Sequence, residues 1–223
     1  MTRLNLHLGA AETLRVLCLG SHSDDIEIGC GGTILQLAEQ FPNSRFHWVV
    51  FSAIGAREQE ARRAANMFAG RNLEEPLVKA FRDGFLPFCG VEVKTIFEEL
   101  KGQVSPHIIF THNRYDAHQD HRLVADLTWN TFRDHLILEY EVPKYDGDLG
   151  QPGVFVPLSP ETCQKKVRYL MEAFPTQRAK GWFEETTFLS LMRLRGMECH
   201  AASGYAEAFF GRKLTLGIEG KSQ

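Results

Sequence analysis

The chain has 223 residues, of which 43% are hydrophobic and 24% are charged. These proportions are typical of a globular protein and argue against a disordered, collagen-like or coiled-coil chain. The 25 basic and 28 acidic residues leave a formal net charge of -3, which does not favour a broad surface for nucleic acid. The length favours one large domain over two small ones.

The sequence has no uninterrupted apolar run of about 18 residues, so we expect no stable membrane insertion. Residues 1–20 lack the ordered basic, apolar and cleavage-site regions of a signal peptide. The five cysteines are widely spaced and form no C-x-x-C motif, which fits reduced thiols better than a disulfide framework. We therefore expect a cytoplasmic protein, and the sequence is compatible with a homo-oligomer.

Short apolar runs alternate with stretches of helical periodicity along the chain. This alternation predicts an α/β fold with a mostly parallel, Rossmann-like sheet and helices on both faces, although it does not give the strand order. The predicted strands are residues 14–20, 45–52, 76–81, 107–112, 136–142 and 206–210. The predicted helices are residues 32–40, 57–68, 91–100, 120–132, 161–174 and 181–195.

One segment, residues 143–160, breaks this alternation because it is rich in proline and glycine. It cannot form a regular helix. A long connection without regular structure inside a compact domain is usually a lid, a binding loop or a linker. We expect it to contribute to substrate binding.

Histidines and carboxylates gather in two segments that directly follow predicted strands. Residues 21–32 read SHSDDIEIGCGG, and residues 111–122 read THNRYDAHQDHR. Binding sites of open α/β sheets form at the carboxyl ends of the strands, so segments far apart in the sequence can meet there. Neutral imidazoles and carboxylates suit a divalent ion such as zinc, and a catalytic zinc site takes three protein ligands.

The spacing within each segment allows pairs of side chains to point at one place. His22 and Asp25 are three positions apart in a turn, and His118 and His121 are three apart at the start of a predicted helix. A lone histidine in a loop is most often a solvated residue or a hydrogen-bonding partner. The clustering of several histidines with carboxylates at two strand ends is what favours a metal site.

The glycines of the GCGG sequence admit a second interpretation, a phosphate cradle at a helix N-terminus. Their spacing does not match G-x-G-x-x-G, and no G-K-[ST] follows, so support for dinucleotide binding is weak. We expect Gly29, Gly31 and Gly32 to form a tight turn whose backbone lies close to the site.

The two segments together resemble a known family. SHSDDIEIGCGG resembles the motif (A/P)HPDD-x-x-x-GCGG, and DAHQDHR resembles D-x-H-x-D-H. This combination is similar to the LmbE-like (PIG-L) zinc-dependent de-N-acetylases, and FRDGFLP at residues 81–87 resembles a further segment of that family. Ser23 stands where the family often has proline, which changes the stiffness of the loop and removes no ligand. The resemblance implies one deacetylase domain over residues 1–223.

The resemblance also implies roles for individual residues. His22, Asp25 and His121 match the ligands of one Zn2+ per chain, although another divalent metal would suit the same side chains. Asp24 matches the general base. The implied reaction is hydrolysis of an N-acetyl amide, such as that of N-acetylglucosamine or another amino sugar or amino-sugar conjugate, to acetate and a free amine.

A second pair completes the implied catalytic set. His118 matches the histidine that stabilises the tetrahedral intermediate, and Asp120 sits where a carboxylate would orient that histidine. We expect Asp120 to favour the protonated form of His118, which would donate to the developing oxyanion.

Further polar residues follow the predicted strands and are candidates for contact with the substrate. They are Arg57, Asp83, Asn113 and Arg114. His112 and Asp116 lie in the second segment, and we expect them to shape the loop or to hydrogen-bond to metal ligands. The sequence does not name the substrate beyond a small N-acetylated molecule.

Two other functions compete with deacetylation. The chain could be a noncatalytic Rossmann-like module that binds a metal or a nucleotide, with the histidines in a structural role. It could also hydrolyse a phosphoester, but the sequence lacks the second carboxylate-rich cluster of a two-metal phosphatase.

Overall fold

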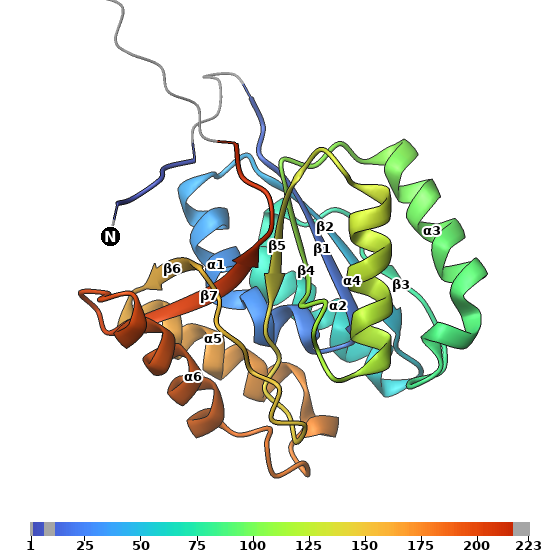
Figure 1. Cartoon of the computed structure of the whole chain (residues 1–223). Coiled ribbons are helices and arrows are strands. Elements are labelled where there is room, and N and C mark those ends of the chain that lie inside the picture. The colour runs from blue at the N-terminus through green and yellow to red at the C-terminus, as the bar shows by residue number, and fades with distance from the viewer. Residues whose placement is uncertain (1, 7–11, 216–223) are drawn as a thin grey trace, which may run out of the picture.

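The computed structural model describes residues 2–6 and 12–215, and within them it contains one sheet of seven strands (Figure 1). The strand order is β3-β2-β1-β4-β5-β7-β6. The strands are β1 (Arg15–His22), β2 (Arg45–Ser52), β3 (Leu77–Val78), β4 (Ile108–His112), β5 (Leu136–Tyr140), β6 (Val154–Leu158) and β7 (Tyr205–Gly211). Strands β1 to β5 run parallel, whereas β7 is antiparallel to both β5 and β6.

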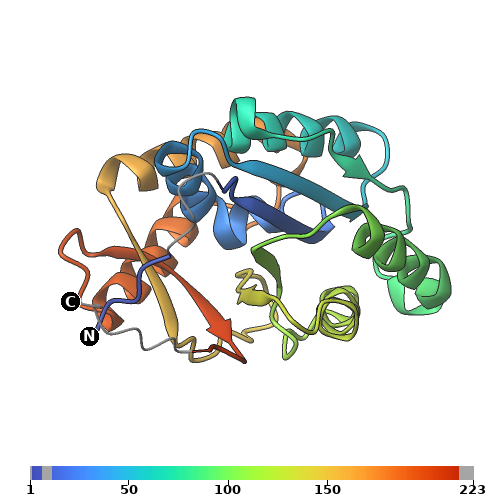
Figure 2. The ribbon, with the colours of Figure 1, turned by 90° about the horizontal axis from the view of Figure 1, so that it is seen from above.

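Helices cover both faces of this sheet (Figure 2). They are α1 (Asp25–Gln40), α2 (Ala56–Ala69), α3 (Gly90–Gln103), α4 (Gln119–Thr131), α5 (Pro160–Ala173) and α6 (Glu185–Glu198). Side chains of α1, α2, α5 and α6 form one buried apolar cluster with the sheet, and those of α3 and α4 form another. The prediction of an α/β fold with a mostly parallel sheet is confirmed. None of the helices described is long and apolar enough to cross a membrane.

Strand β1 shows how the sequence builds the two faces. Its residues are buried almost without interruption, as expected for a central strand of a parallel sheet. Val16 and Cys18 pack in the cluster with α1, and Leu17 and Leu19 pack in the cluster with α3 and α4. This alternation places successive side chains on opposite faces.

The first helix differs from its prediction. It begins at Asp25 rather than near Gly32, so the GCGG sequence is helical and the expectation of a tight turn is wrong. Close packing explains the glycines better. A Cβ atom on Gly29 would lie 2.1 Å from Tyr140 Cδ2, and one on Gly32 would lie 2.5 Å from Leu158 Cδ1. Glycine therefore lets α1 approach β5 and β6 closely.

The proline- and glycine-rich segment also differs from its prediction, because its second half forms strand β6. Val156 of β6 pairs with Glu207 of β7 in an antiparallel ladder at the edge of the sheet. An edge strand tolerates Pro157, since one side of its backbone needs no partner strand. In contrast, β3 covers only two of the residues predicted for it. Residues 1, 7–11 and 216–223 of the expected domain lie outside the described part of the chain.

The close packing of α1 predicts the effect of an added methyl group. Gly29→Ala is expected to lower the free energy of unfolding by about 1–3 kcal/mol, because the new Cβ would collide with Tyr140. Gly102→Ala in α3 is the control, since a Cβ added there would meet nothing within 4 Å and alanine favours helix by about 0.5–1 kcal/mol. Urea denaturation of both variants checks this, and a Gly29→Ala protein as stable as wild type would contradict it.

Candidate metal centre

The two motif segments meet at the carboxyl ends of β1 and β4, which are adjacent strands. His22 is the last residue of β1 and Asp25 the first of α1, so the first motif spans the junction between them. His118 is the N-cap of α4, which places His121 in the first turn of that helix. The side chains of His22, Asp25 and His121 are all buried.

The three residues expected to bind the metal lie close together. His22 Nδ1 is 3.2 Å from His121 Nε2 and 3.3 Å from Asp25 Oδ2. His121 Nε2 is 3.5 Å from Asp25 Oδ1. Two ligands at about 2.0–2.1 Å from a tetrahedral zinc are separated by about 3.3 Å, so these separations suit a common ion, with the two histidines facing different oxygens of Asp25.

The second nitrogen of each imidazole faces a carboxylate. His22 Nε2 is 3.3 Å from Asp120 Oδ2 and 3.0 Å from Asp83 Oδ1. His121 Nδ1 is 2.9 Å from Asp116 Oδ2. Carboxylates in this position fix the tautomer and orientation of metal-binding histidines, so the surroundings of both rings also fit a metal.

Besides the set of His22, Asp25 and His121, three other groups of side chains among the residues described have ligand atoms close enough together to hold an ion. They are His22, His118 and His121; Asp25, His112 and His121; and His22, Asp83 and Asp120. His112 is less suited, because its Nε2 accepts a hydrogen bond from the Ser21 amide at 2.9 Å. The Asp120 carboxylate is also engaged, since it accepts hydrogen bonds from the backbone amides of Gly84 and Leu86.

Burial and neighbouring charges shift the pKa values of the adjacent carboxyls of Asp24 and Asp25 in opposite directions. Burial raises the pKa of Asp25, but His121, His112 and His22 outweigh it and leave the pKa well below its usual value. The pKa of Asp24 is raised, mainly by burial and then by the charge of Asp25, while Arg57 opposes this shift. Asp25 is thus suited to ligate a cation and Asp24 to exchange a proton.

Two of the four candidate substrate contacts reach this site. Arg57 donates to Asp24 Oδ1 at 3.3 Å, to Ser23 Oγ at 3.1 Å and to Asp83 Oδ2 at 3.1 Å. Asp83 lies between Arg57 and His22, with 54% of its side chain exposed. The guanidinium is therefore engaged by residues of the site itself, and Asp83 has an open side toward solvent.

The side chains of the other two candidates hydrogen-bond elsewhere. Asn113 is buried, and its Oδ1 accepts a hydrogen bond from the Tyr115 amide at 3.0 Å, which shapes the loop. The guanidinium of Arg114 donates to Asp126 of α4 at 2.7 Å. In the described part of the chain, no hydrogen bond or ion pair joins the Arg114 side chain to the histidine cluster. Position after a strand does not fix the direction in which a long side chain points.

The pairing expected between His118 and Asp120 is also different. The Asp120 carboxylate faces His22, whereas its backbone amide donates to His118 Nδ1 at 3.2 Å. Burial lowers the pKa of His118, and the neighbouring His121 and His22 lower it further. The lowered pKa favours the neutral form of His118, and in that form the acceptor role of Nδ1 leaves the ring proton on Nε2.

One residue of the site carries no signal in the sequence. Lys144 follows β5, and its Nζ lies 2.9 Å from Asp116 Oδ1 and 2.5 Å from Asp148 Oδ2. It thereby holds the carboxylate that orients His121. Lys144 belongs to no motif and is far from the histidines in the sequence, so the sequence does not indicate its contact with Asp116.

The family comparison agrees with the two motifs. A model of the PIG-L family, described as GlcNAc-PI de-N-acetylase, matches residues 17–132, which is more than half of the chain. The chain belongs to this family. The matched range includes both motif segments, and therefore every residue of the metal cluster. A comparison with curated proteins gives no match.

Solved structures share the fold of this PIG-L protein at low sequence identity. A conserved protein from Thermus thermophilus has a TM-score of 0.72 and 19% identity, covering 92% of this chain and 98% of its own. A diacetylchitobiose deacetylase from Pyrococcus horikoshii has a TM-score of 0.65 and 18% identity, with coverages of 89% and 83%. A 4-carboxy-2-hydroxymuconate hydratase from Pseudomonas putida has a TM-score of 0.68 and 17% identity, with coverages of 93% and 100%.

The protonation of His22 predicts how zinc affinity depends on pH. Burial lowers the pKa of His22, but Asp25, Asp120 and Asp83 outweigh it and raise the pKa well above its usual value. Zinc must displace this proton, so affinity is expected to keep rising between pH 7 and pH 8, where an ordinary imidazole with a pKa of about 6.5 would no longer contribute. Competition titration with a chromophoric chelator measures this. An affinity that is flat above pH 7 would contradict the prediction.

The carboxylate behind His121 gives a second prediction. Asp116→Asn is expected to weaken zinc binding by about 10–100-fold, because the amide no longer holds His121 in its metal-binding orientation. Asp126→Asn is the control, since Asp126 lies on the same helix as His121 but pairs with Arg114, and its side chain is 51% exposed. Isothermal titration with zinc compares the two, and equal affinities would argue against a role for Asp116.

Proposed function

We propose that this PIG-L protein removes an N-acetyl group from an amino sugar or an amino-sugar conjugate, releasing acetate and a free amine, with one Zn2+ held by His22, Asp25 and His121. The observation that carries the proposal is the placement of Asp24. Its buried carboxylate lies between His22 and Asp25 in the first motif, and the ion pair that it makes is with Arg57, 3.3 Å away, rather than with a histidine of the cluster.

Zinc bound by these three residues would polarise the amide carbonyl and acidify a water molecule. Asp24 supplies the base that accepts the proton of that water and then transfers it to the leaving amine. Its raised pKa brings its proton affinity closer to neutral pH, which suits both steps. Arg57, 3.3 Å from Asp24 Oδ1, holds the carboxylate in place and limits the rise in its pKa.

His118 is suited to stabilise negative charge on the carbonyl oxygen. Because its Nδ1 accepts the Asp120 amide, the neutral ring carries its proton on Nε2 and can donate it in a hydrogen bond. The His118 and His22 ring centroids are 4.8 Å apart, so this donor stands next to a proposed ligand. Removing one such donor typically lowers turnover by about a hundred-fold to a thousand-fold.

The arrangement does not favour the nucleotide-binding alternative. The N-terminus of α1, where a phosphate would bind, carries Asp24 and Asp25. Two carboxylates at that position would repel a phosphate, whereas they attract a metal ion. A noncatalytic metal site has no need of the buried, unligated Asp24 beside it.

The substrate is proposed to be a small molecule, and no nucleic-acid partner is proposed. Because the buried cysteines are free thiols, a reducing compartment such as the cytoplasm suits the protein. We further propose one domain over residues 1–223, and a homo-oligomer is compatible with it. Asp83 is the candidate for binding a sugar hydroxyl, since its carboxylate is partly exposed beside His22.

A panel of N-acetylated amino sugars, assayed for liberated primary amine, tests the proposal. We expect release that stops on chelation and returns when zinc is added back. Asp24→Asn should lower turnover by about a hundred-fold to ten-thousand-fold while one zinc still binds per chain. Asp134→Asn, at an exposed aspartate, is the matched control and should retain activity.

The same panel separates the alternatives. A phosphoester and an unsaturated carboxylic acid, the kind of compound that a hydratase acts on, are included as competing substrates. Turnover of either one without amine release, or full activity in Asp24→Asn, would contradict the proposed reaction. Zinc binding with no turnover of any substrate would favour the noncatalytic module.

A further inference from the structure

A buried ion pair between Lys166 and Glu207 forms hydrogen bonds with the backbone of α1. The carboxylate of Glu207, on β7, accepts the backbone amide hydrogens of Gly32 and Thr33, each at 2.7 Å. In a regular α-helix these amides donate to the carbonyl oxygens four residues earlier, at Ile28 and Gly29. The Ile28 carbonyl accepts from Lys166 Nζ of α5 at 2.6 Å. Side chains therefore compete with part of the backbone ladder.

The same two side chains bind each other. Lys166 Nζ donates to Glu207 Oε1 at 2.6 Å, and the Thr33 hydroxyl donates to Glu207 Oε2 at 2.6 Å. Lys166 is 2% exposed and Glu207 is 4% exposed. Burying both charges is costly unless each is fully hydrogen-bonded. Here four donors satisfy the carboxylate, so the pair is a specific clamp on the backbone of α1.

The clamped turn separates α1 into two parts. The part before it begins at Asp25 in the metal centre, and side chains of both parts pack in the core. A side chain inserted into the backbone ladder is a known cause of a bend in a helix. The clamp also reaches the first turn directly, because the Ile28 carbonyl accepts from Lys166 and the Ile28 amide donates to the Asp24 carbonyl at 3.1 Å.

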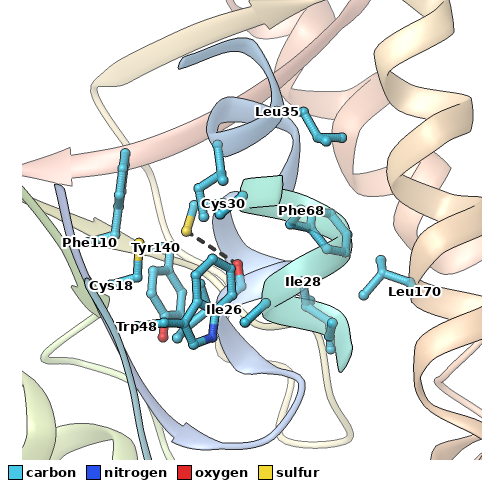
Figure 3. Close-up of a cluster of buried hydrophobic side chains, with 14 of the residues drawn as sticks. Cys18, Ile26, Ile28, Cys30, Leu35, Trp48, Phe68, Phe110, Tyr140 and Leu170 are labelled. Atoms are coloured by element: carbon cyan, nitrogen blue, oxygen red, sulfur yellow. Dashed lines mark hydrogen bonds between the residues drawn. The ribbon is translucent and has the colours of Figure 1, made fainter. Parts of the chain in front are cut away.

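Both apolar packing and hydrogen bonds hold the first half of α1 in place. Ile26, Ile28 and Cys30 anchor this stretch in the core, and the glycines between and after them let neighbouring side chains approach its backbone. Figure 3 shows its surroundings: Tyr140 lies on one side of α1, and Phe68 and Leu170 lie on the other. These contacts are apolar, whereas the hydrogen bonds of Glu207 and Lys166 are directional and add a polar constraint on the backbone of α1.

We propose that Lys166 and Glu207 are positioning residues for the metal centre, which they serve by holding the first turn of α1 at the angle that brings Asp25 to His22 and His121. This inference rests on the proposed zinc site. Both residues lie beyond residues 17–132, so the C-terminal part of the chain contributes to a centre whose proposed ligands all come from the family-matched part.

Glu207→Gln tests the inference while keeping the size of the side chain. The side-chain amide of this variant has an NH2 group in place of one carboxylate oxygen. This donor faces backbone amides that also donate, so hydrogen bonds of the clamp are lost. We expect the dissociation constant for zinc to rise by about 2–30-fold, the range for residues that influence a site without contacting its ligand. The visible absorption of the cobalt-substituted protein is expected to shift, because the Asp25 carboxylate is displaced. Thermal unfolding verifies that the variant is folded.

Glu141→Gln is the matched control. Glu141 is 6% exposed and pairs with Arg195 at 2.7 Å, so it belongs to another buried ion pair of this region. Across residues 2–6 and 12–215 its carboxylate makes no hydrogen bond to α1. This variant is expected to lose stability in a similar way, with unchanged zinc affinity and cobalt spectrum.

Amide hydrogen exchange in the metal-free protein gives an independent readout. Exchange at Gly32 and Thr33 is expected to be about tenfold faster in Glu207→Gln, and unchanged in Glu141→Gln. Should Glu207→Gln not fold, Thr33→Val removes one of the four donors and serves as the milder variant, with smaller changes in the same direction.

A folded Glu207→Gln protein with wild-type zinc affinity overturns the inference, and so does unchanged exchange at Gly32 and Thr33. These outcomes leave the deacetylase proposal intact. Failure of the wild-type protein to bind zinc overturns the proposed site instead, and the exchange rates then decide alone whether the pair holds α1.

Discussion

The parallel pairing of β1 with β4 is the constraint on which the site depends. Each strand ends in a histidine, and each is followed by a helix whose first turn points back to the same edge of the sheet. His22 and His121 are far apart in the sequence, yet their ring nitrogens lie 3.2 Å apart because the two strands are neighbours. A change that shifted the register between β1 and β4 would separate them.

The burial of several carboxylates explains why a bound cation would stabilise the site. Asp24, Asp25, Asp116 and Asp120 are all buried, and burial opposes ionisation of each carboxyl. The imidazoles and Lys144 offset part of this cost through hydrogen bonds and ion pairs. A divalent ion between His22, Asp25 and His121 would offset the remaining cost of burying these negative charges. Asp24 would then be the one carboxylate of these four available for proton transfer.

The sequence predicted the features that depend on local pattern. Continuous apolar runs predicted the buried strands. The two motifs predicted which side chains converge, because the spacing of ligands within a motif is a short-range property of the sequence. The sequence did not predict the features that depend on contacts between distant residues. The GCGG segment is helical because α1 packs against Tyr140 and Leu158, and Arg114 turns toward Asp126. The contact of Glu207 with Gly32 joins residues that no local pattern connects.

A crystal structure of the zinc-loaded protein, with the ion located by anomalous scattering at the zinc edge, tests the central claim most directly. We expect one ion at about 2.0–2.2 Å from His22 Nδ1, from a carboxylate oxygen of Asp25 and from His121 Nε2, with Asp24 unligated. An ion bound instead by His22 Nε2, Asp83 and Asp120, or one ligated by Asp24, would contradict it.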